Sequence, residues 1–431
     1  MKAIGISKLA SAICAVLICL TAQAQDFDPN NYITGDWNGA RSRLESDGVD
    51  LHLSYVGEFA RNTSGGERHA NAYADQIYLG AAFDLDKLVG WQGATFKIDV
   101  TDRNGDSVNQ RAGYPTLLQS QEIYGRGTVV RLTQFSLTQK LFDDRLSLKA
   151  GRLYANADLF SISCKFESLT FCGGLPGYIS NGMYTDPISQ YGAVAVLSPI
   201  QDLQFKLGAY NVNPQNLAKD QGLRLGTSGR TLGTLYLGEL DYKPRWDDGV
   251  DGDYRLGGWH NTSNYQEVVN RIGLPTSLSD AVASVASSEN GYYLNAEQQV
   301  FRNAAGGGLR VFFSWTQADR AVDRLNQIIE AGAWLDAPFP SRPNDRIGIA
   351  FARTQVSPNL NRAQSLYDAL LPATSPLRIG VQRFEYPIEL NYNLALTKAI
   401  SLMPNVQYVR HADGLAGNNG TVAGLQVRLN F

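Results

Sequence analysis

Apolar and polar residues alternate along most of this chain, and the last segment, 421–431, shows the pattern most clearly. Gln426 and Arg428 interrupt an apolar set made of Leu425, Val427, Leu429 and Phe431. Alternation with a period of two predicts a β-strand with one apolar and one polar face. Because the termini of soluble proteins tend to fray, this strand favours the closing strand of a transmembrane barrel, with the apolar set as its lipid-facing assembly signal. An edge strand of a soluble β-sandwich is the alternative.

The same alternation predicts about sixteen strands. They cover residues 51–60, 73–84, 94–102, 128–139, 146–154, 190–197, 203–211, 231–242, 253–261, 291–301, 308–317, 327–335, 345–355, 384–395, 400–410 and 421–431. A soluble sandwich would show the same period with its polar face in bulk water, so strand parity alone does not separate the two folds. The parity is least regular at 128–139, 231–242 and 327–335.

The lengths of the connections between strands distinguish the transmembrane barrel from the soluble sandwich. Residues 140–145, 198–202, 302–307 and 396–399 form short connections, whereas 103–127, 155–189, 262–290 and 356–383 form long ones. Short and long connections mostly alternate, which is typical of short periplasmic turns and long extracellular loops. The sequence therefore predicts an all-β fold, an antiparallel up-and-down barrel across the outer membrane of a Gram-negative bacterium, with both termini in the periplasm.

The chain begins with the features of a secretory leader. Lys2 and Lys8 precede an apolar stretch, and a small-residue cleavage site ends at Ala24, so residues 1–24 are predicted to be removed. Residues 25–50 are then a periplasmic segment with a short amphipathic helix over 36–46, capped by Asn38 or Asp36. This helix is interpreted as a tether at the barrel's lower rim or as a plug. Residues 51–431 form the barrel.

Composition narrows the function. The formal net charge is −3, and it becomes more negative once Lys2 and Lys8 leave with the leader, which excludes a strongly basic nucleic-acid binder. Cys164 and Cys172 are the cysteines that remain after the leader, and in an exported protein they are expected to form a disulfide. No metal-ligand spacing and no catalytic motif accompanies the four histidines. We therefore expect no enzyme, no cofactor and no bound metal.

A barrel with this number of strands leaves water inside, whereas a barrel of about eight strands is filled by side chains. Conduction of small solutes is therefore the expected function. Residues 155–189 form the longest predicted loop and carry both remaining cysteines. This loop either folds into the lumen as a constriction, stiffened by the disulfide, or covers the barrel as a surface lid.

Several short motifs resemble a known family. Residues Thr34–Arg41 read TGDWNGAR and precede Leu44 and the strand at 50–51. Further motifs lie at 149–153 with Asn156 and Asp158, and at 210–214, 254–259, 342–345, 386–392 and 404–408. In order and spacing they resemble the carbohydrate-selective porins of the OprB type. The resemblance implies a sixteen-stranded outer-membrane porin that favours neutral sugars such as glucose.

Neutral sugars carry hydroxyls that donate and accept, together with apolar ring faces, so a selective lumen needs charges of both signs, amides and aromatic rings. The polar positions of the alternating strands are predicted to face the lumen, and they include cations, acids and an amide. Aromatic residues that could stack on a sugar ring lie beside them. The candidates are Lys97, Asp99, Lys149, Lys206, Glu297, Arg310, Glu389, Asn391, Trp259, Tyr78 and Tyr293. Arg152 joins them through the resemblance alone, and its inward placement requires a β-bulge.

Other functions stay open from the sequence. A porin for another solute class, such as phosphate or aromatic acids, is the nearest, although phosphate favours a lumen whose cations lack compensating acids. The second alternative is a barrel that does not conduct solutes, such as a lipase or an adhesin. The predicted partners are sugars, outer-membrane lipid, lipopolysaccharide and the barrel-assembly machinery, and a homotrimer is left open.

Overall fold

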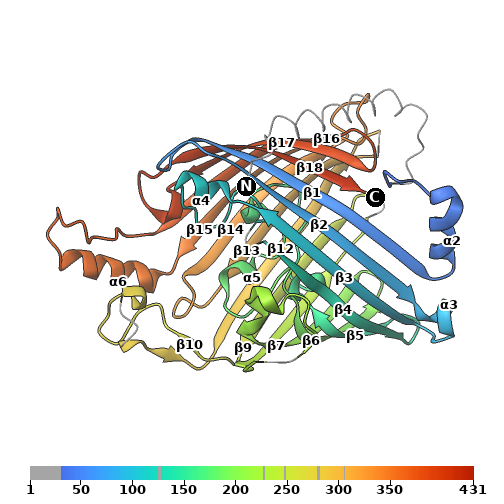
Figure 1. Cartoon of the computed structure of the whole chain (residues 1–431), viewed down its shortest axis with the longest axis horizontal. Helices are drawn as coiled ribbons and strands as arrows, with labels where there is room; N and C mark the ends of the chain where they lie inside the picture. The colour runs from blue at the N-terminus through green and yellow to red at the C-terminus, as the bar shows by residue number, and fades with distance from the viewer. Residues whose placement is uncertain (1–30, 125–127, 227–228, 247–248, 279–281, 305) are drawn as a thin grey trace.

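The computed structural model is a closed barrel of antiparallel strands (Figure 1). It describes residues 31–124, 128–226, 229–246, 249–278, 282–304 and 306–431; the leader predicted at 1–24 lies outside these residues. The sixteen barrel strands are β1 (Val49–Ser64), β2 (Asn71–Asp84), β3 (Ala94–Gly105), β4 (Val129–Leu141), β5 (Leu146–Leu153), β6 (Gln190–Ile200), β7 (Leu203–Val212), β8 (Gly233–Tyr242), β9 (Gly252–Asn261), β12 (Glu289–Arg302), β13 (Gly308–Gln317), β14 (Leu325–Asp336), β15 (Arg346–Val356), β16 (Phe384–Ala395), β17 (Ile400–Arg410) and β18 (Gly420–Asn430).

The predicted fold class and strand count are confirmed. Every predicted strand overlaps one barrel strand, and the ranges 308–317, 384–395 and 400–410 agree at both ends. The segments of irregular parity, 128–139, 231–242 and 327–335, became β4, β8 and β14 with shifts of one or two residues at their ends. Neighbours in sequence pair in space, as an up-and-down barrel requires.

The barrel closes where the last strand meets the first. In β18, Leu425 pairs with Phe59 and Leu429 pairs with Tyr55 of β1. The Phe431 amide donates to the Leu53 carbonyl at 2.9 Å, so the end of the chain stays in the ladder. A slip of one residue would exchange the apolar and polar faces of the strand, which fixes this register.

The apolar face of the barrel points outward. Leu207, Leu256 and Leu79 are large and exposed on the outer wall, whereas Glu58 and Glu389 are fully buried on the inward parity. This arrangement reverses that of a soluble protein and suits a wall in contact with hydrocarbon. Among the helices in the described residues, none has the length and apolarity needed to cross a bilayer.

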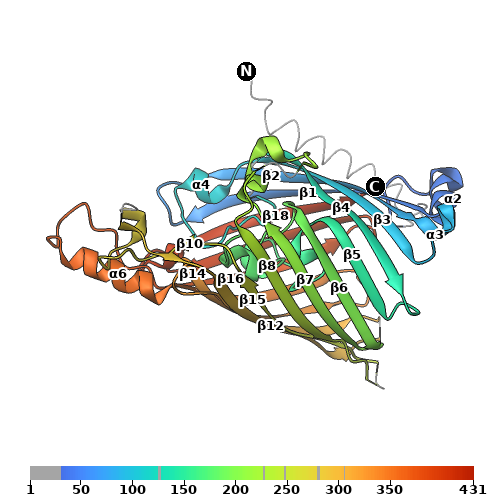
Figure 2. The same cartoon turned by 90° about the horizontal axis from the view of Figure 1, so that it is seen from below.

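Short helices and an extra two-stranded sheet lie in the segment before β1 and in the connections between the barrel strands. They are η1 (Trp37–Gly39), α2 (Ala40–Ser46), α3 (Leu85–Val89), α4 (Val108–Ala112), η2 (Ala155–Ala157), η3 (Leu169–Phe171), α5 (Pro176–Ile179), η4 (Pro214–Leu217), η5 (Lys219–Gln221), β10 (Tyr265–Gln266), η6 (Thr276–Leu278), β11 (Val285–Ala286), α6 (Pro358–Ala369) and η8 (Ala412–Gly414). Of these, η2, η3 and α5 belong to the connection between β5 and β6. In Figures 1 and 2, α2 and α3 lie at the short-turn end, and α6 and β10 lie at the long-loop end.

The predicted helix near the N-terminus is present, with different capping. Asn38 adopts a left-handed conformation within η1, so it does not cap α2. Asp36 accepts hydrogen bonds from the amide and the hydroxyl of Ser42, at 2.8 and 2.7 Å. Arg41, the buried residue of α2, donates to the carbonyls of Leu51 and Phe431, at 3.2 and 2.7 Å. These contacts tie α2 to the barrel rim and favour the tether over the plug.

Candidate functional site

Residues 154–189, here called the long inner loop, lie inside the barrel against its polar wall. The Asp158 carbonyl accepts a hydrogen bond from Lys206 Nζ at 3.1 Å. The Phe160 amide donates to Glu239 at 2.6 Å, and the Ser163 hydroxyl donates to Glu297 at 2.8 Å. The loop therefore follows the inner surface past β7, β8 and β12.

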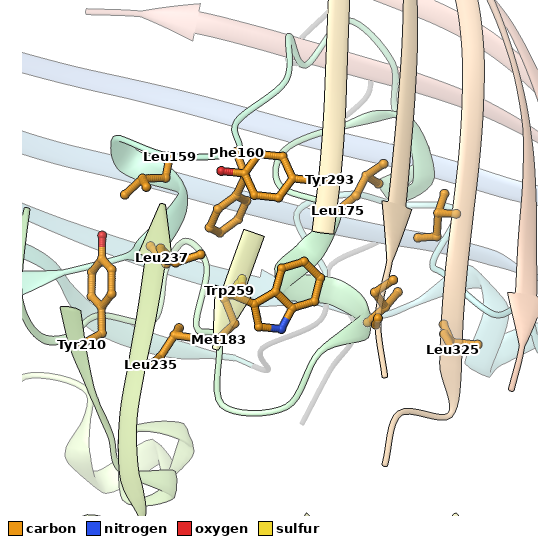
Figure 3. Close-up of a cluster of buried hydrophobic side chains, with 14 of the residues drawn as sticks. Leu159, Phe160, Leu175, Met183, Tyr210, Leu235, Leu237, Trp259, Tyr293 and Leu325 are labelled. Atoms are coloured by element: carbon orange, nitrogen blue, oxygen red, sulfur yellow. The ribbon is translucent and has the colours of Figure 1, made fainter. Parts of the chain in front are cut away.

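An apolar cluster fixes the same loop to the wall. In Figure 3, Leu159, Phe160, Leu175 and Met183 of the loop lie beside Leu237, Trp259 and Tyr293 of the strands. The rings of Phe160 and Tyr293 meet edge to face, 5.9 Å apart. Side chains of this size supply most of the burial energy in a protein interior, so the loop has a packed core of its own.

The tip of the long inner loop is a narrow hairpin. Ile162 and Gly173 pair across it, and the Cys164–Cys172 disulfide joins its two sides, as predicted. At its end, the amides of Glu167 and Ser168 donate to the two carboxylate oxygens of Glu389 on β16, at 2.9 and 2.8 Å. The hairpin therefore reaches the wall opposite the loop's base.

A second segment, residues 106–124, also turns inward and is called the short inner loop. The Leu117 amide donates to Glu385 at 2.9 Å, and Gln407 Nε2 donates to the Ser120 carbonyl at 2.9 Å. The Leu169 amide donates to the Gln119 carbonyl at 3.0 Å, which joins the two inner loops. Together the two loops narrow the lumen from several sides.

Glutamates of the wall repeatedly hold the backbone of these loops. Each is buried on the inward face of a strand and accepts at least one loop amide. The set is Glu58, Glu239, Glu289, Glu385 and Glu389, with amide partners Ile123, Phe160, Asn181, Leu117 and the pair Glu167 and Ser168. A buried amide left without an acceptor costs about 1–3 kcal/mol, so these contacts hold the loops against the wall.

A cavity of about 370 Å³ remains between the two inner loops and the wall formed by β2, β3 and β18. It carries charges of both signs, amides, and leucine and tyrosine side chains. Its lining is Gln76, Arg103, Leu117, Leu118, Gln119, Glu122, Tyr124, Asn156, Cys164, Leu169, Cys172, Gly173, Tyr178, Thr185, Asp186 and Arg428. Its volume lies within the roughly 300–1,000 Å³ of small-molecule sites.

Each cation of this cavity has an acidic partner. Arg103 donates to Asp186 at 2.7 Å and to Gln76 at 2.6 Å. Arg428 lies 3.3 Å from Glu122, and 39% of its side chain is exposed, against 13% for Glu122. The lining therefore presents donors and acceptors together, without an excess of either charge.

Burial alters the acids that line the cavity. It raises the pKa of Glu122 above the ordinary value, and the nearby Arg428 opposes the rise. Burial likewise raises the pKa of Asp186, against the opposing effect of Arg103. Both carboxyls therefore take up protons at a higher pH than exposed acids do.

Most of the predicted site residues hold the inner loops or pair with one another. Lys149 Nζ lies 2.5 Å from Asp158, and Lys206 pairs with Glu239 and Asp241 at 2.8 and 2.7 Å. Asn391 Nδ2 donates to the Lys165 carbonyl at 3.0 Å, beside Glu389. These side chains contact the long inner loop, which covers most of their surface.

The remaining charged candidates lie in two groups on the wall. Arg310 pairs with Glu297 at 3.3 Å and with Asp251. Lys97 and His52 both contact Asp99, at 3.1 Å each. Glu297 also lines a smaller hollow of about 80 Å³, together with Arg255, Asp253 and Phe312.

The aromatic candidates and Arg152 are less available to a solute. Trp259 and Tyr293 are 5% and 0% exposed beneath the long inner loop, whereas Tyr78 is half-buried and stacks on His52. Arg152 is 4% exposed and donates to the carbonyls of Ser189 and Arg224. The pairing of β5 with both neighbours shows no shift of register, so the predicted bulge is absent.

The sequence reasoning missed much of the cavity lining. Arg103 continues the inward parity of Lys97 and Asp99, so a longer β3 would have identified it. Arg428 lies on the polar face of the last strand but is not among the predicted site residues. Glu122 and Asp186 lie in loops, where no alternation of polar and apolar residues indicates which side chains point into the lumen.

Comparisons with known proteins bear on this geometry. A model described as "Carbohydrate-selective porin, OprB family" matches residues 68–431. The chain belongs to this family. It is 34% identical to Porin B of Pseudomonas aeruginosa, over 95% of this chain and 93% of that protein. It is 32% identical to a protein of Acinetobacter baylyi described as "Putative porin QuiX", over 98% of this chain and 99% of that protein.

A solved structure agrees with this assignment to the OprB family. The high pH structure of Pseudomonas putida OprB superposes with a TM-score of 0.88 at 33% identity, covering 93% of this chain and 98% of that one. The resemblance predicted from the motifs is confirmed. The protein is therefore an outer-membrane porin of a Gram-negative bacterium, a channel rather than an enzyme, which sets aside the lipase and the adhesin.

Proposed function

We propose that this porin lets monosaccharides such as glucose diffuse passively and selectively across the outer membrane. The solute passes through the cavity between the two inner loops, which form the constriction. The long loops face the medium, and both termini face the periplasm. The observation that carries the proposal is the lining of the cavity, in which Arg103 and Arg428 are each paired with an acid beside amides, leucines and tyrosines.

The chemistry of this lining suits an uncharged, hydroxyl-rich solute. Paired charges offer strong donors and acceptors to hydroxyl groups, and Leu117, Tyr124 and Tyr178 offer apolar surface to the ring. A phosphate or a dicarboxylate would need cations without neighbouring acids. Because Arg103 and Arg428 are both compensated, anions gain less from this site than sugars do.

The experiment is a solute-block measurement in planar bilayers. Glucose should reduce the ion current at a lower concentration than a dicarboxylate or an amino acid of similar size. Arg428→Gln should weaken the glucose block by roughly ten- to a hundredfold, since a hydrogen bond to a charged group is worth about 1.5–3 kcal/mol. Arg145→Gln, exposed in a short turn, is the matched control.

Equal block by glucose and the dicarboxylate would contradict the selectivity, and an unchanged block in the Arg428 variant would contradict the site. The homotrimer stays a prediction, and chemical cross-linking of the folded protein tests it.

A further inference from the structure

The outer wall of the barrel carries a basic and aromatic patch at the long-loop ends of β15, β16 and β17. Its members are Arg353, Phe384, Tyr386, Arg410 and His411, here called the rim patch. Tyr386 pairs with Arg410 on one side. On the other side Arg353 lies beside it, because the adjacent Thr354 pairs with Glu385. With strands about 4.8 Å apart, the two arginines stand about 10 Å apart across the tyrosine.

The side chains of the rim patch contact one another. The Arg353 guanidinium lies 5.2 Å from the centroid of the Phe384 ring. The Phe384 and Tyr386 rings are 6.3 Å apart, and the Tyr386 and His411 rings are 5.9 Å apart. These contacts make one continuous surface rather than separate side chains.

Neither arginine of the patch forms an ion pair within the described part of the chain. Arg353 donates to the amide oxygen of Gln327, and Arg410 is exposed at the last position of β17. In contrast, Arg103 and Arg428 in the lumen each have an acidic partner. Two guanidinium charges on the outer wall are therefore left without a compensating acid from these residues.

The depth of the patch follows from the residues below it on the same outward faces. Phe351, Leu390 and Val406 are 47%, 53% and 51% exposed, on β15, β16 and β17 respectively. In a membrane barrel such residues face hydrocarbon, and aromatic residues mark the level of the headgroups. The rim patch begins within a few residues of this apolar band, so it lies at headgroup level.

The charge at the long-loop end changes around the barrel: Arg61 of β1 is also exposed there and donates to Asn71, whereas β2 and β3 carry acids. On β3, Asp102 lies opposite Ile77 of β2, which is exposed on the outer wall. Asp102 and Asp75 therefore put acidic groups on the same outward face at the long-loop end. A basic rim is not a general property of this barrel.

We propose that the rim patch binds the phosphate groups of a phosphorylated lipid headgroup in the outer leaflet. This inference rests on the proposed orientation, with the long loops facing the medium. Guanidinium groups form short, charge-assisted hydrogen bonds to phosphate. The apolar wall directly below Arg353 and Arg410 accommodates the acyl chains, which favours a lipid over free phosphate.

The test measures binding of diphosphorylated lipid A to the full, folded protein in detergent, by native mass spectrometry. The wild-type protein should retain this lipid and should not retain the same lipid after its phosphates are removed. The double variant Arg353→Gln/Arg410→Gln should bind roughly thirtyfold more weakly, taking about 1 kcal/mol per arginine. The control Arg145→Gln, at the opposite end of the barrel, should bind as the wild type does.

Equal retention of the phosphorylated and dephosphorylated lipids would overturn the proposal, and this comparison needs no variant. Displacement of the lipid by millimolar inorganic phosphate would point to a free-phosphate site and would also overturn it. A change of oligomeric state in the double variant would mark the patch as a contact between copies, with the same consequence. The glucose block should be unchanged in the double variant, so failure of this inference is distinguishable from failure of the proposed function.

Discussion

Glu389 provides the most direct test of how the constriction is held. Its carboxylate is fully buried and accepts the amides of Glu167 and Ser168, at 2.9 and 2.8 Å. Glu389→Ala leaves both amides without an acceptor, at about 1–3 kcal/mol each. Glu389→Gln keeps one oxygen and should lose about half of that stabilisation. We therefore expect the tip of the long inner loop to detach from β16, more often in the alanine variant.

Single-channel recording in planar bilayers measures this effect. Mean conductance and current noise should rise in the order wild type, Glu389→Gln, Glu389→Ala, because a detached tip widens the lumen and fluctuates. The concentration of glucose that halves the current should rise in the same order. The order of the two variants is informative, because misfolding alone would not place the conductance of Glu389→Gln between those of the wild type and Glu389→Ala.

Glu330 supplies a matched control. It is equally buried on β14 and, among the residues that the structure describes, it accepts no amide of the inner loops. Glu330→Gln should leave conductance and glucose block unchanged. If a folded Glu389→Ala channel also matched the wild type in both measurements, the claim that wall glutamates pin the loop would be refuted.

Three further predictions concern the disulfide of the long inner loop, the contacts of α2 with the barrel, and the charge of the cavity. Replacing Cys164 and Cys172 together by serine opens a crosslink spanning 8 residues, and the chain-entropy estimate of about 2–3 kcal/mol predicts a lower unfolding temperature and a noisier current. Arg41→Ala removes the hydrogen bonds from α2 to Leu51 and Phe431 and should lower the temperature of heat modification on gels, whereas Arg41→Lys should restore part of the loss. Burial raises the pKa of Glu122, so acidification neutralises this carboxyl before ordinary acids and leaves the cavity more positive. Reversal potentials should therefore shift toward anion selectivity as the pH is lowered, and Glu122→Gln should show the anion preference already at neutral pH, with a smaller shift on acidification.

The sequence alone was sufficient for the barrel because strand pairing in this fold is between neighbours. The alternation at 384–395 and 400–410 predicts which residues face lipid. The four residues between these strands are enough only for a tight turn. Local pattern and global topology therefore carry the same information. The disulfide was also local, since Cys164 and Cys172 lie in one loop.

The direction of the loops could not be predicted in this way. The sequence left residues 155–189 as either a constriction or a lid, because a loop has no period that states which way it folds. Its position depends on glutamates far away in sequence, such as Glu239 and Glu389, and on Trp259 and Tyr293 beneath it.

What the sequence determined by itself is the sorting of side chains between the two faces of the wall, since parity follows from strand geometry. What only the tertiary structure decided is which inward residues a solute can reach. Lys206 and Trp259 share the inward parity, yet the long inner loop covers them, whereas Arg428 remains exposed at the cavity. The physical reason is that exposure inside a lumen depends on what lies across it, and contacts across the lumen join segments that no local pattern connects.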